Sequence, residues 1–319
     1  VTGVQTCALP ISIGRSVAEM RALYMDLAPR IFRRIWWRAR GLQAKFDSRP
    51  LVEALKREMG DMRLDDPGIR TLLAIVAKRV DTGAPWIIST VPGQPYWDTP
   101  ADGSYIGNRN FRLAQIVRAS TAAPYYFAPE AIPISDRGPP GMFVDGAVTP
   151  YNDPALPLMM LARMRRYGLQ WPPGADNLLL LSIGTGTFRL KVDVSGIKLK
   201  PAAGFALETV VGLMSDSQNA SLGMMQWLAH SPAPWPVNSE VGDLGGEFLG
   251  AEALMTYQRY DLKLEREWLA RALGAKLDEK AVVRLRQLDD PRIMGKLDEL
   301  ATAAAERQVN MEALKAFFV

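Results

Sequence analysis

The sequence is nearly devoid of cysteine and histidine, with one of each, Cys7 and His230, among 319 residues. A single thiol cannot form a disulfide within the chain, and a zinc site built from cysteine and histidine would lack ligands. A Ser-His-Asp hydrolase would have to use His230, which stands at the end of a predicted helix before a proline-rich loop. Hydrolytic chemistry in this chain would therefore need a mechanism without histidine.

Long apolar runs are missing as well. No stretch approaches the ~18 apolar residues of a membrane-spanning helix, so we expect a soluble or peripheral membrane protein. The net charge is +4 and the basic residues form no long tract, which argues against nucleic acid as a partner. The hydrophobic share of 48% is ordinary for a globular chain that buries a core.

The first residues, VTGVQTCALPI, differ in character from the rest of the chain, because they have neither a signal-peptide charge pattern nor a helical period. They resemble translated sequencing-adaptor sequence. We therefore expect residues 1–11 to be a non-native leader, with the natural sequence beginning near Ser12 after a lost N-terminal segment. The alternative is an ordinary disordered N-terminus.

Apolar periodicity predicts alternating helices and strands in the first 190 residues. Helices are expected over 16–35, 48–59, 112–120 and 156–164, and strands over 86–91, 142–144 and 178–183, with 71–80 either helix or strand. Ser16 and Glu19 have the spacing of a capping box. Strands that alternate with helices and glycine turns predict a three-layer α/β/α sandwich, with the three strands as buried neighbours. After about residue 205 the pattern is mainly helical.

Basic residues flank a pair of tryptophans in the stretch Arg33–Arg40. Such a segment could lie in a lipid headgroup layer and give peripheral membrane contact. The alternative is a solvated helix end whose tryptophans pack inward.

Asp145, Gly146 and Ala147 directly follow the predicted strand 142–144. Ligand sites in α/β sheets lie at the carboxyl ends of strands, and a carboxylate in a cleft can take the proton of a hydroxyl nucleophile. Gly146 removes bulk beside that base and permits a tight turn. The alternative is that Asp145 only caps the turn, as Asp-Gly pairs often do.

Several segments together resemble the patatin-like phospholipase family. They are Gly14–Met20, Ala119–Phe127, Phe143–Val148 with Asn152-Asp153-Pro154, and Leu181–Gly186. The resemblance implies a lipid acyl hydrolase, a phospholipase A or carboxylic ester hydrolase, that uses a Ser-Asp dyad and no metal or cofactor. Asp145 would be the catalytic aspartate, with Gly146 and Ala147 completing its motif. The substrate would be a lipid or phospholipid ester.

The same family places its serine in a Gly-x-Ser-x-Gly elbow, and the chain contains no such pattern. On the resemblance we predict three regions: the leader 1–11, a truncated catalytic domain over 12–190, and a mainly helical region over 191–319 packed on it. The chain as it stands is expected to be inactive.

Two other functions stay open. The first is a module that binds acyl lipid without turning it over. The second is a nucleotide-binding α/β protein, for which the only pointer is Gly184-Thr185-Gly186. This turn lacks the Lys-Ser/Thr ending of a phosphate-binding loop.

Overall fold

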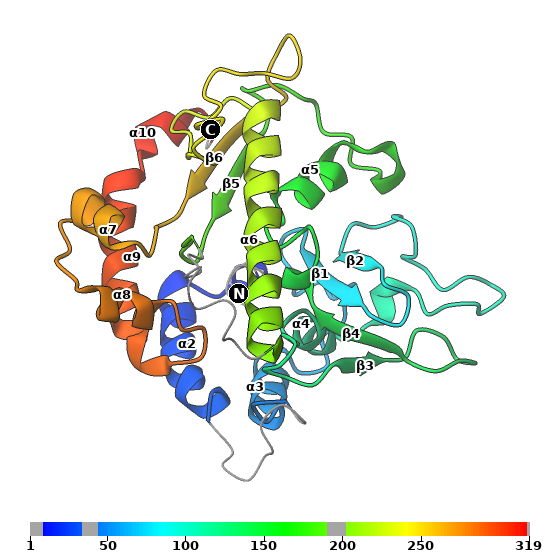
Figure 1. The fold of residues 1–319 in the computed structure, drawn as a ribbon. Helices are drawn as coiled ribbons and strands as arrows, with labels where there is room; N and C mark the ends of the chain where they lie inside the picture. Colours follow the sequence, from blue (N-terminus) through cyan, green and yellow to red (C-terminus); the bar gives the residue numbers. More distant parts are fainter. Residues whose placement is uncertain (1–8, 34–43, 190–201, 318–319) are drawn as a thin grey trace. The chain divides into compact units, whose positions relative to one another are not determined.

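A computed structural model describes residues 9–33, 44–189 and 202–317. They fall into two compact units, Val1–Gln170 and Trp171–Val319 (Figure 1). The tryptophan-rich stretch 34–40 and residues 1–8 of the expected leader lie outside the described residues. The predicted domain limits, with a boundary near residue 190, stay a prediction.

Four helices of the first unit begin and end close to where the periodicity placed them. They are α2 (Val17–Ile31), α3 (Arg49–Met59), α4 (Leu113–Ser120) and α5 (Ala155–Arg163). The capping box of α2 is confirmed: the Glu19 amide donates to Ser16 Oγ at 3.2 Å, and the Ser16 amide donates to the Glu19 carboxylate at 2.7 Å. The two bonds satisfy amide N–H groups at the start of the helix, which have no acceptor within the helix itself.

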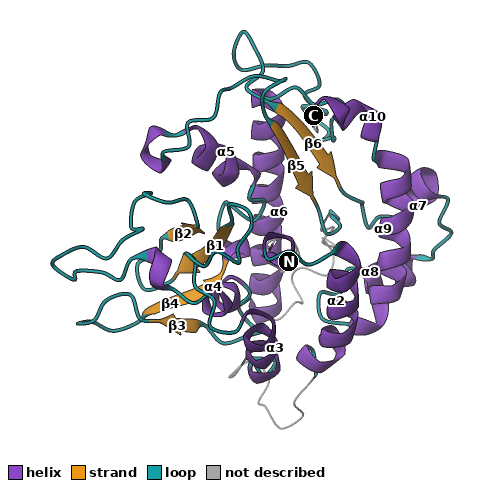
Figure 2. Cartoon of the chain, turned by 180° about the vertical axis from the view of Figure 1, so that it is seen from behind, coloured by secondary structure: helices purple, strands orange, loops and turns teal. Residues whose placement is uncertain are grey.

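The sheet of the first unit has the strand order β2-β1-β4-β3, and all three of its pairings are antiparallel (Figure 2). The strands are β1 (Ala74–Arg79), β2 (Pro85–Ser89), β3 (Glu130–Ile132) and β4 (Gly141–Asp145). Residues 71–80, which the sequence left open between helix and strand, therefore contain a strand, β1. It lies between β2 and β4. Its register places Ala77 opposite Asp145.

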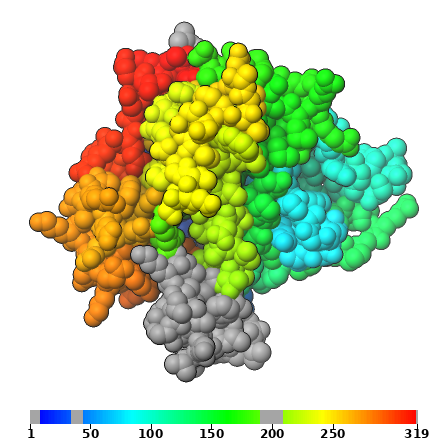
Figure 3. Space-filling model, turned by 45° about the horizontal axis from the view of Figure 1, so that its top comes forward, coloured from blue at the N-terminus to red at the C-terminus, as the bar shows by residue number. Residues whose placement is uncertain are grey.

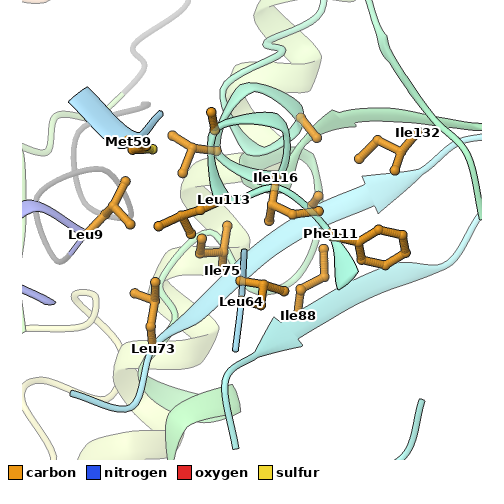
Figure 4. Close-up of a cluster of buried hydrophobic side chains, with 14 of the residues drawn as sticks. Leu9, Met59, Leu64, Leu73, Ile75, Ile88, Phe111, Leu113, Ile116 and Ile132 are labelled. Carbon is orange, nitrogen blue, oxygen red and sulfur yellow. The ribbon is translucent and has the colours of Figure 1, made fainter. Parts of the chain in front are cut away.

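One face of this sheet is covered by α4. Leu113, Ile116 and Val117 recur at helical spacing and are all buried, so the apolar stripe of this helix faces the core. Figure 4 shows Leu113 and Ile116 among the inward residues of β1 and β2, which include Ile75 and Ile88. This packing fixes the end of β4, where Asp145 lies.

The second unit is mainly helical around two parallel strands. Its strands are β5 (Leu179–Ile183) and β6 (Thr256–Tyr260). Its α-helices are α6 (Ala202–Leu228), α7 (Arg266–Leu273), α8 (Glu279–Leu285), α9 (Met294–Gln308) and α10 (Met311–Leu314). The segment between α6 and β6, yellow in Figure 3, forms an outer surface of this unit. The mixed α/β class and the helical C-terminal part are thus confirmed.

The prediction that strands 86–91, 142–144 and 178–183 are neighbours was wrong. The first two are separated by β1, and the third, β5, pairs with β6 in the second unit. Leu181 and Ile183 of β5 are 40% and 63% exposed, so this apolar run is not buried on both faces. A run of four leucines fits any strand that other elements cover. Its periodicity does not show which strand it pairs with, because the partner β6 lies more than seventy residues further along the chain.

Among the described residues, no helix is both long enough and apolar enough to cross a membrane.

Candidate active site

Asp145 is the last residue of β4 and is almost completely buried, with 3% exposure. Its backbone amide donates to the carbonyl of Ala122 at 3.1 Å, while its strand pairs with β1 at Ala77. The strand end is therefore fixed from two directions, by the sheet and by the turn that follows α4. The position at the carboxyl end of a strand is the one predicted from the sequence.

The two carboxylate oxygens of Asp145 have different surroundings. Oδ1 accepts the amide N–H of Ala147 at 2.8 Å, which caps the short 3-10 turn Gly146–Val148. Oδ2 is buried and receives no hydrogen bond from any described residue. Turn capping therefore explains the bond to Oδ1 but leaves Oδ2 without a donor. Buried polar atoms seldom lack a hydrogen-bond partner.

Burial changes the acidity of this carboxyl. It raises the pKa of Asp145 to about 6, because a carboxylate loses its hydration inside the protein, while the Ala147 N–H acts in the opposite direction. A carboxylate with a pKa near 6 is a stronger base than an exposed aspartate and is still largely ionised at neutral pH. Both properties suit a general base.

Gly146 is explained by a close approach of the backbone. A Cβ at this position would overlap the carbonyl of Val76 in β1, so only glycine lets the turn pack on the strand. The same carbonyl oxygen accepts the hydroxyl of Ser120 at 2.6 Å. Val76 thus helps to position the Asp-Gly-Ala turn through its main chain, a role that its side-chain type does not reveal in the sequence.

Pro10–Gly14 is one of several stretches that differ from a serine elbow at one fixed position, and it has proline where the elbow has its first glycine. Ser12 within it is 1% exposed, and its hydroxyl donates to the carbonyl of Leu9 at 2.7 Å. That bond is the kind formed within a helical turn. Nothing in this geometry marks Ser12 as a nucleophile.

His230 belongs to the second unit and makes main-chain hydrogen bonds there. Its amide donates to Met255 and its carbonyl accepts the amide of Tyr257, each at 2.9 Å, so it extends the pairing of β6. Its side chain is exposed. This position gives the histidine a structural role in the edge of the sheet.

The Gly184–Gly186 turn is held by a buried acidic group. Oδ1 of Asp261 accepts the Gly186 amide at 2.9 Å, and Oδ2 pairs with Arg259 at 2.6 Å. A Cβ on Gly184 would overlap the Asp261 carboxylate. A phosphate would meet this carboxylate where a phosphate-binding loop offers N–H donors, so the geometry does not favour nucleotide binding.

No group of three His, Cys, Asp or Glu side chains that could hold a metal ion is present in the part of the chain that the structure describes.

Two comparisons bear on this site. Residues 6–159, which include Asp145, match the family model of the patatin-like phospholipases. A curated protein, patatin-like protein 4 of Arabidopsis thaliana, is 26% identical over 210 residues, which are 61% of this chain and 50% of that protein. The chain thus spans about half the length of the curated relative it matches.

Proposed function

Because residues 6–159 match the family model of the patatin-like phospholipases, we propose that Asp145 is the general base of a lipid acyl hydrolase of this family, whose serine elbow the present sequence lacks. The observation that carries the proposal is the buried Oδ2 of Asp145, which has no hydrogen-bond donor among the described residues. A base needs such an oxygen to receive a proton, and Ala147 leaves it available by binding only Oδ1.

In this mechanism the Asp145 carboxylate takes the proton of a serine hydroxyl while the serine oxygen attacks the ester carbonyl. The tetrahedral intermediate collapses to an acyl-serine, and Asp145 returns the proton to the leaving alkoxide. Water then attacks the acyl-serine with the same assistance, which releases the fatty acid. Histidine has no part in these steps.

The 319-residue sequence contains no Gly-x-Ser-x-Gly, so the serine of this scheme has no counterpart in it. We expect purified protein of this sequence to leave p-nitrophenyl butyrate intact, because loss of a nucleophile and its oxyanion donors lowers rates by orders of magnitude. Serine-dependent turnover that survives removal of contaminants would show that another nucleophile operates.

The decisive experiment is a chimera in which the serine elbow and oxyanion loop of a patatin-like relative precede Ser12. In an active chimera, Asp145→Asn should lower kcat by on the order of 10²–10⁴ with little change in KM. Asparagine caps turns well, so a purely structural aspartate would tolerate this change. His230→Ala is the control and should be catalytically silent. Activity that is lost with His230→Ala and kept with Asp145→Asn would refute the Ser-Asp proposal.

The missing elbow also favours a second candidate, a module that holds acyl lipid without cleaving it. If this is the function, protein of the present sequence should bind a fluorescent fatty acid, and Asp145→Asn should leave its affinity unchanged. If the chimera is inactive although folded and the fatty acid still binds, this second function is preferred.

A further inference from the structure

Two segments of the first unit lie side by side near Asp145. The amide of Lys45 donates to the Tyr125 carbonyl, and the amide of Phe46 donates to the Tyr126 carbonyl, each at 2.9 Å. We call Lys45, Phe46 and Pro124–Tyr126 the tyrosine platform. It begins two residues after Ala122, whose carbonyl accepts the amide N–H of Asp145.

The platform has a buried aromatic base and an exposed upper ring. Phe46 is 1% exposed and stacks with Tyr126 at 6.2 Å between ring centroids, and it also packs against Phe127 at 5.8 Å. Tyr125 meets Tyr126 edge to face at 5.2 Å, yet 49% of Tyr125 stays exposed. Tyr125 is thus the exposed ring of an otherwise packed aromatic group.

A lysine ammonium lies beside these rings. The ammonium of Lys45 lies 5.4 Å from the ring centroid of Phe46, 5.6 Å from that of Tyr125 and 5.5 Å from that of Tyr126. Cation–π attraction therefore holds this ammonium at the exposed tyrosine. The platform combines an amphipathic ring with a cation at one place.

The structure also keeps the platform in one shape. Nη2 of Arg118, a residue with 2% exposure, donates to Ser48 Oγ and to the Ala128 carbonyl, both at 2.8 Å. These bonds tie together the two segments from inside the unit. Tyr125 has φ 72°, a left-handed conformation that bulky residues seldom adopt. Such a conformation persists only where its surroundings impose it.

We propose that the tyrosine platform binds an anionic phospholipid surface, with the Tyr125 ring at headgroup level and the Lys45 ammonium near lipid phosphates. Tyrosine favours this interface because its ring is apolar and its hydroxyl is wet. A basic residue is attracted to an anionic leaflet, and the chain carries a net charge of +4. The inference rests on the proposed function in one respect, that a lipid surface would supply the substrate beside Asp145.

Vesicle sedimentation tests the proposal, with vesicles of ether-linked phosphatidylcholine alone or mixed with ether-linked phosphatidylglycerol. Ether lipids have no acyl ester, so binding is measured apart from hydrolysis, and failure of the hydrolase proposal leaves the result intact. We expect the protein to bind the vesicles that contain phosphatidylglycerol much more strongly. Lys45→Ala should weaken this binding about fivefold, since one basic residue near an anionic leaflet contributes ~1 kcal/mol.

Tyr125→Asn should weaken binding several-fold, because asparagine accepts the left-handed backbone and removes the ring. Tyr125→Phe keeps the ring and should bind almost as well as the wild-type protein. The matched control is Tyr96→Asn, since Tyr96 also has a positive φ, 65°, and is 62% exposed. Lys280→Ala, at an exposed lysine of α8, controls for net charge. Both controls should bind like the wild-type protein.

Hydrogen–deuterium exchange locates the contact. Vesicles should slow exchange in a peptide over residues 122–129, and this slowing should be absent in Tyr125→Asn protein that melts at the wild-type temperature. The proposal is overturned if wild-type protein does not bind anionic vesicles or if Tyr96→Asn loses as much binding as Tyr125→Asn. It is also overturned if vesicles slow exchange only in peptides outside residues 122–129.

Discussion

Asp145→Asn should remove a pH-dependent loss of stability from the first unit. Burial raises the pKa of the Asp145 carboxyl from 3.8 to about 6, so the folded protein holds this proton more tightly than the unfolded chain does. The carboxyl therefore destabilises the folded state only at pH values at which it is ionised in the unfolded chain. Its unfavourable contribution is absent below pH 3.8, grows as pH rises through 6, and is constant above that.

The two pKa values set the size of this effect. A rise from 3.8 to about 6 corresponds to ~3 kcal/mol of unfolding free energy at high pH. Solvent screening does not reduce it much, because Asp145 is only 3% exposed. Roughly 2 kcal/mol of it falls between pH ~4.5 and ~7.5, where the protein can be handled. Asparagine does not titrate, so the difference between the wild-type protein and the variant isolates this one carboxyl from all other acids.

Urea unfolding at several pH values, followed by pulsed hydrogen exchange of peptides from β1 and β4, reports on the unit that holds Asp145. The unfolding free energy of wild-type protein should decrease relative to that of the Asp145→Asn variant by about 2 kcal/mol across that range. A pH-independent difference would mean that the carboxyl has an ordinary pKa. A difference of opposite sign would mean that a donor stabilises the carboxylate, and the argument for a buried base would fail.

Substitutions at three further sites test the local structure. Gly146→Ala should lower the melting temperature of the first unit, with a loss of ~1–3 kcal/mol, because its Cβ would overlap the Val76 carbonyl; unchanged melting would contradict that close approach. Ser16→Ala should destabilise α2 by ~1 kcal/mol through loss of its capping box, while Ser16→Asp should restore most of this in urea unfolding. Asp261→Ala should lower the stability of the second unit by ~3–5 kcal/mol, because it leaves Arg259 buried without its carboxylate, and a loss below ~1 kcal/mol would show that the pair is dispensable.

Much of the local structure could be predicted because it depends on neighbours in the sequence. The Ser16–Glu19 capping box needs only a three-residue spacing. The buried face of α4 follows from the spacing of Leu113, Ile116 and Val117. The position of Asp145 at a strand end follows from an apolar run that stops at an Asp-Gly pair.

The chemistry of the candidate site was decided by tertiary structure. The sequence showed an acidic residue in a turn, but the pKa of Asp145 depends on burial under segments far away in the chain. The bond from Ala147 to one oxygen is local, but the burial of the other oxygen without a donor depends on the segments that pack around it. Desolvation and hydrogen bonding act through space, so no local pattern reports them.

The pairing of the strands and the grouping of the aromatic residues also required the structure. The run Leu179–Ile183 has the composition of a buried strand, but its partner β6 begins at Thr256. Lys45 and Tyr125 are eighty residues apart in the sequence, yet they are joined by a backbone hydrogen bond. The sequence by itself determined the four helices of the first unit and the strands β2, β4 and β5, because those choices depend on side-chain spacing and local bonds; it left β1 open, and β3 and β6 were not predicted. Only the folded chain decided which segments meet, because contacts between distant residues depend on the packing of the whole unit.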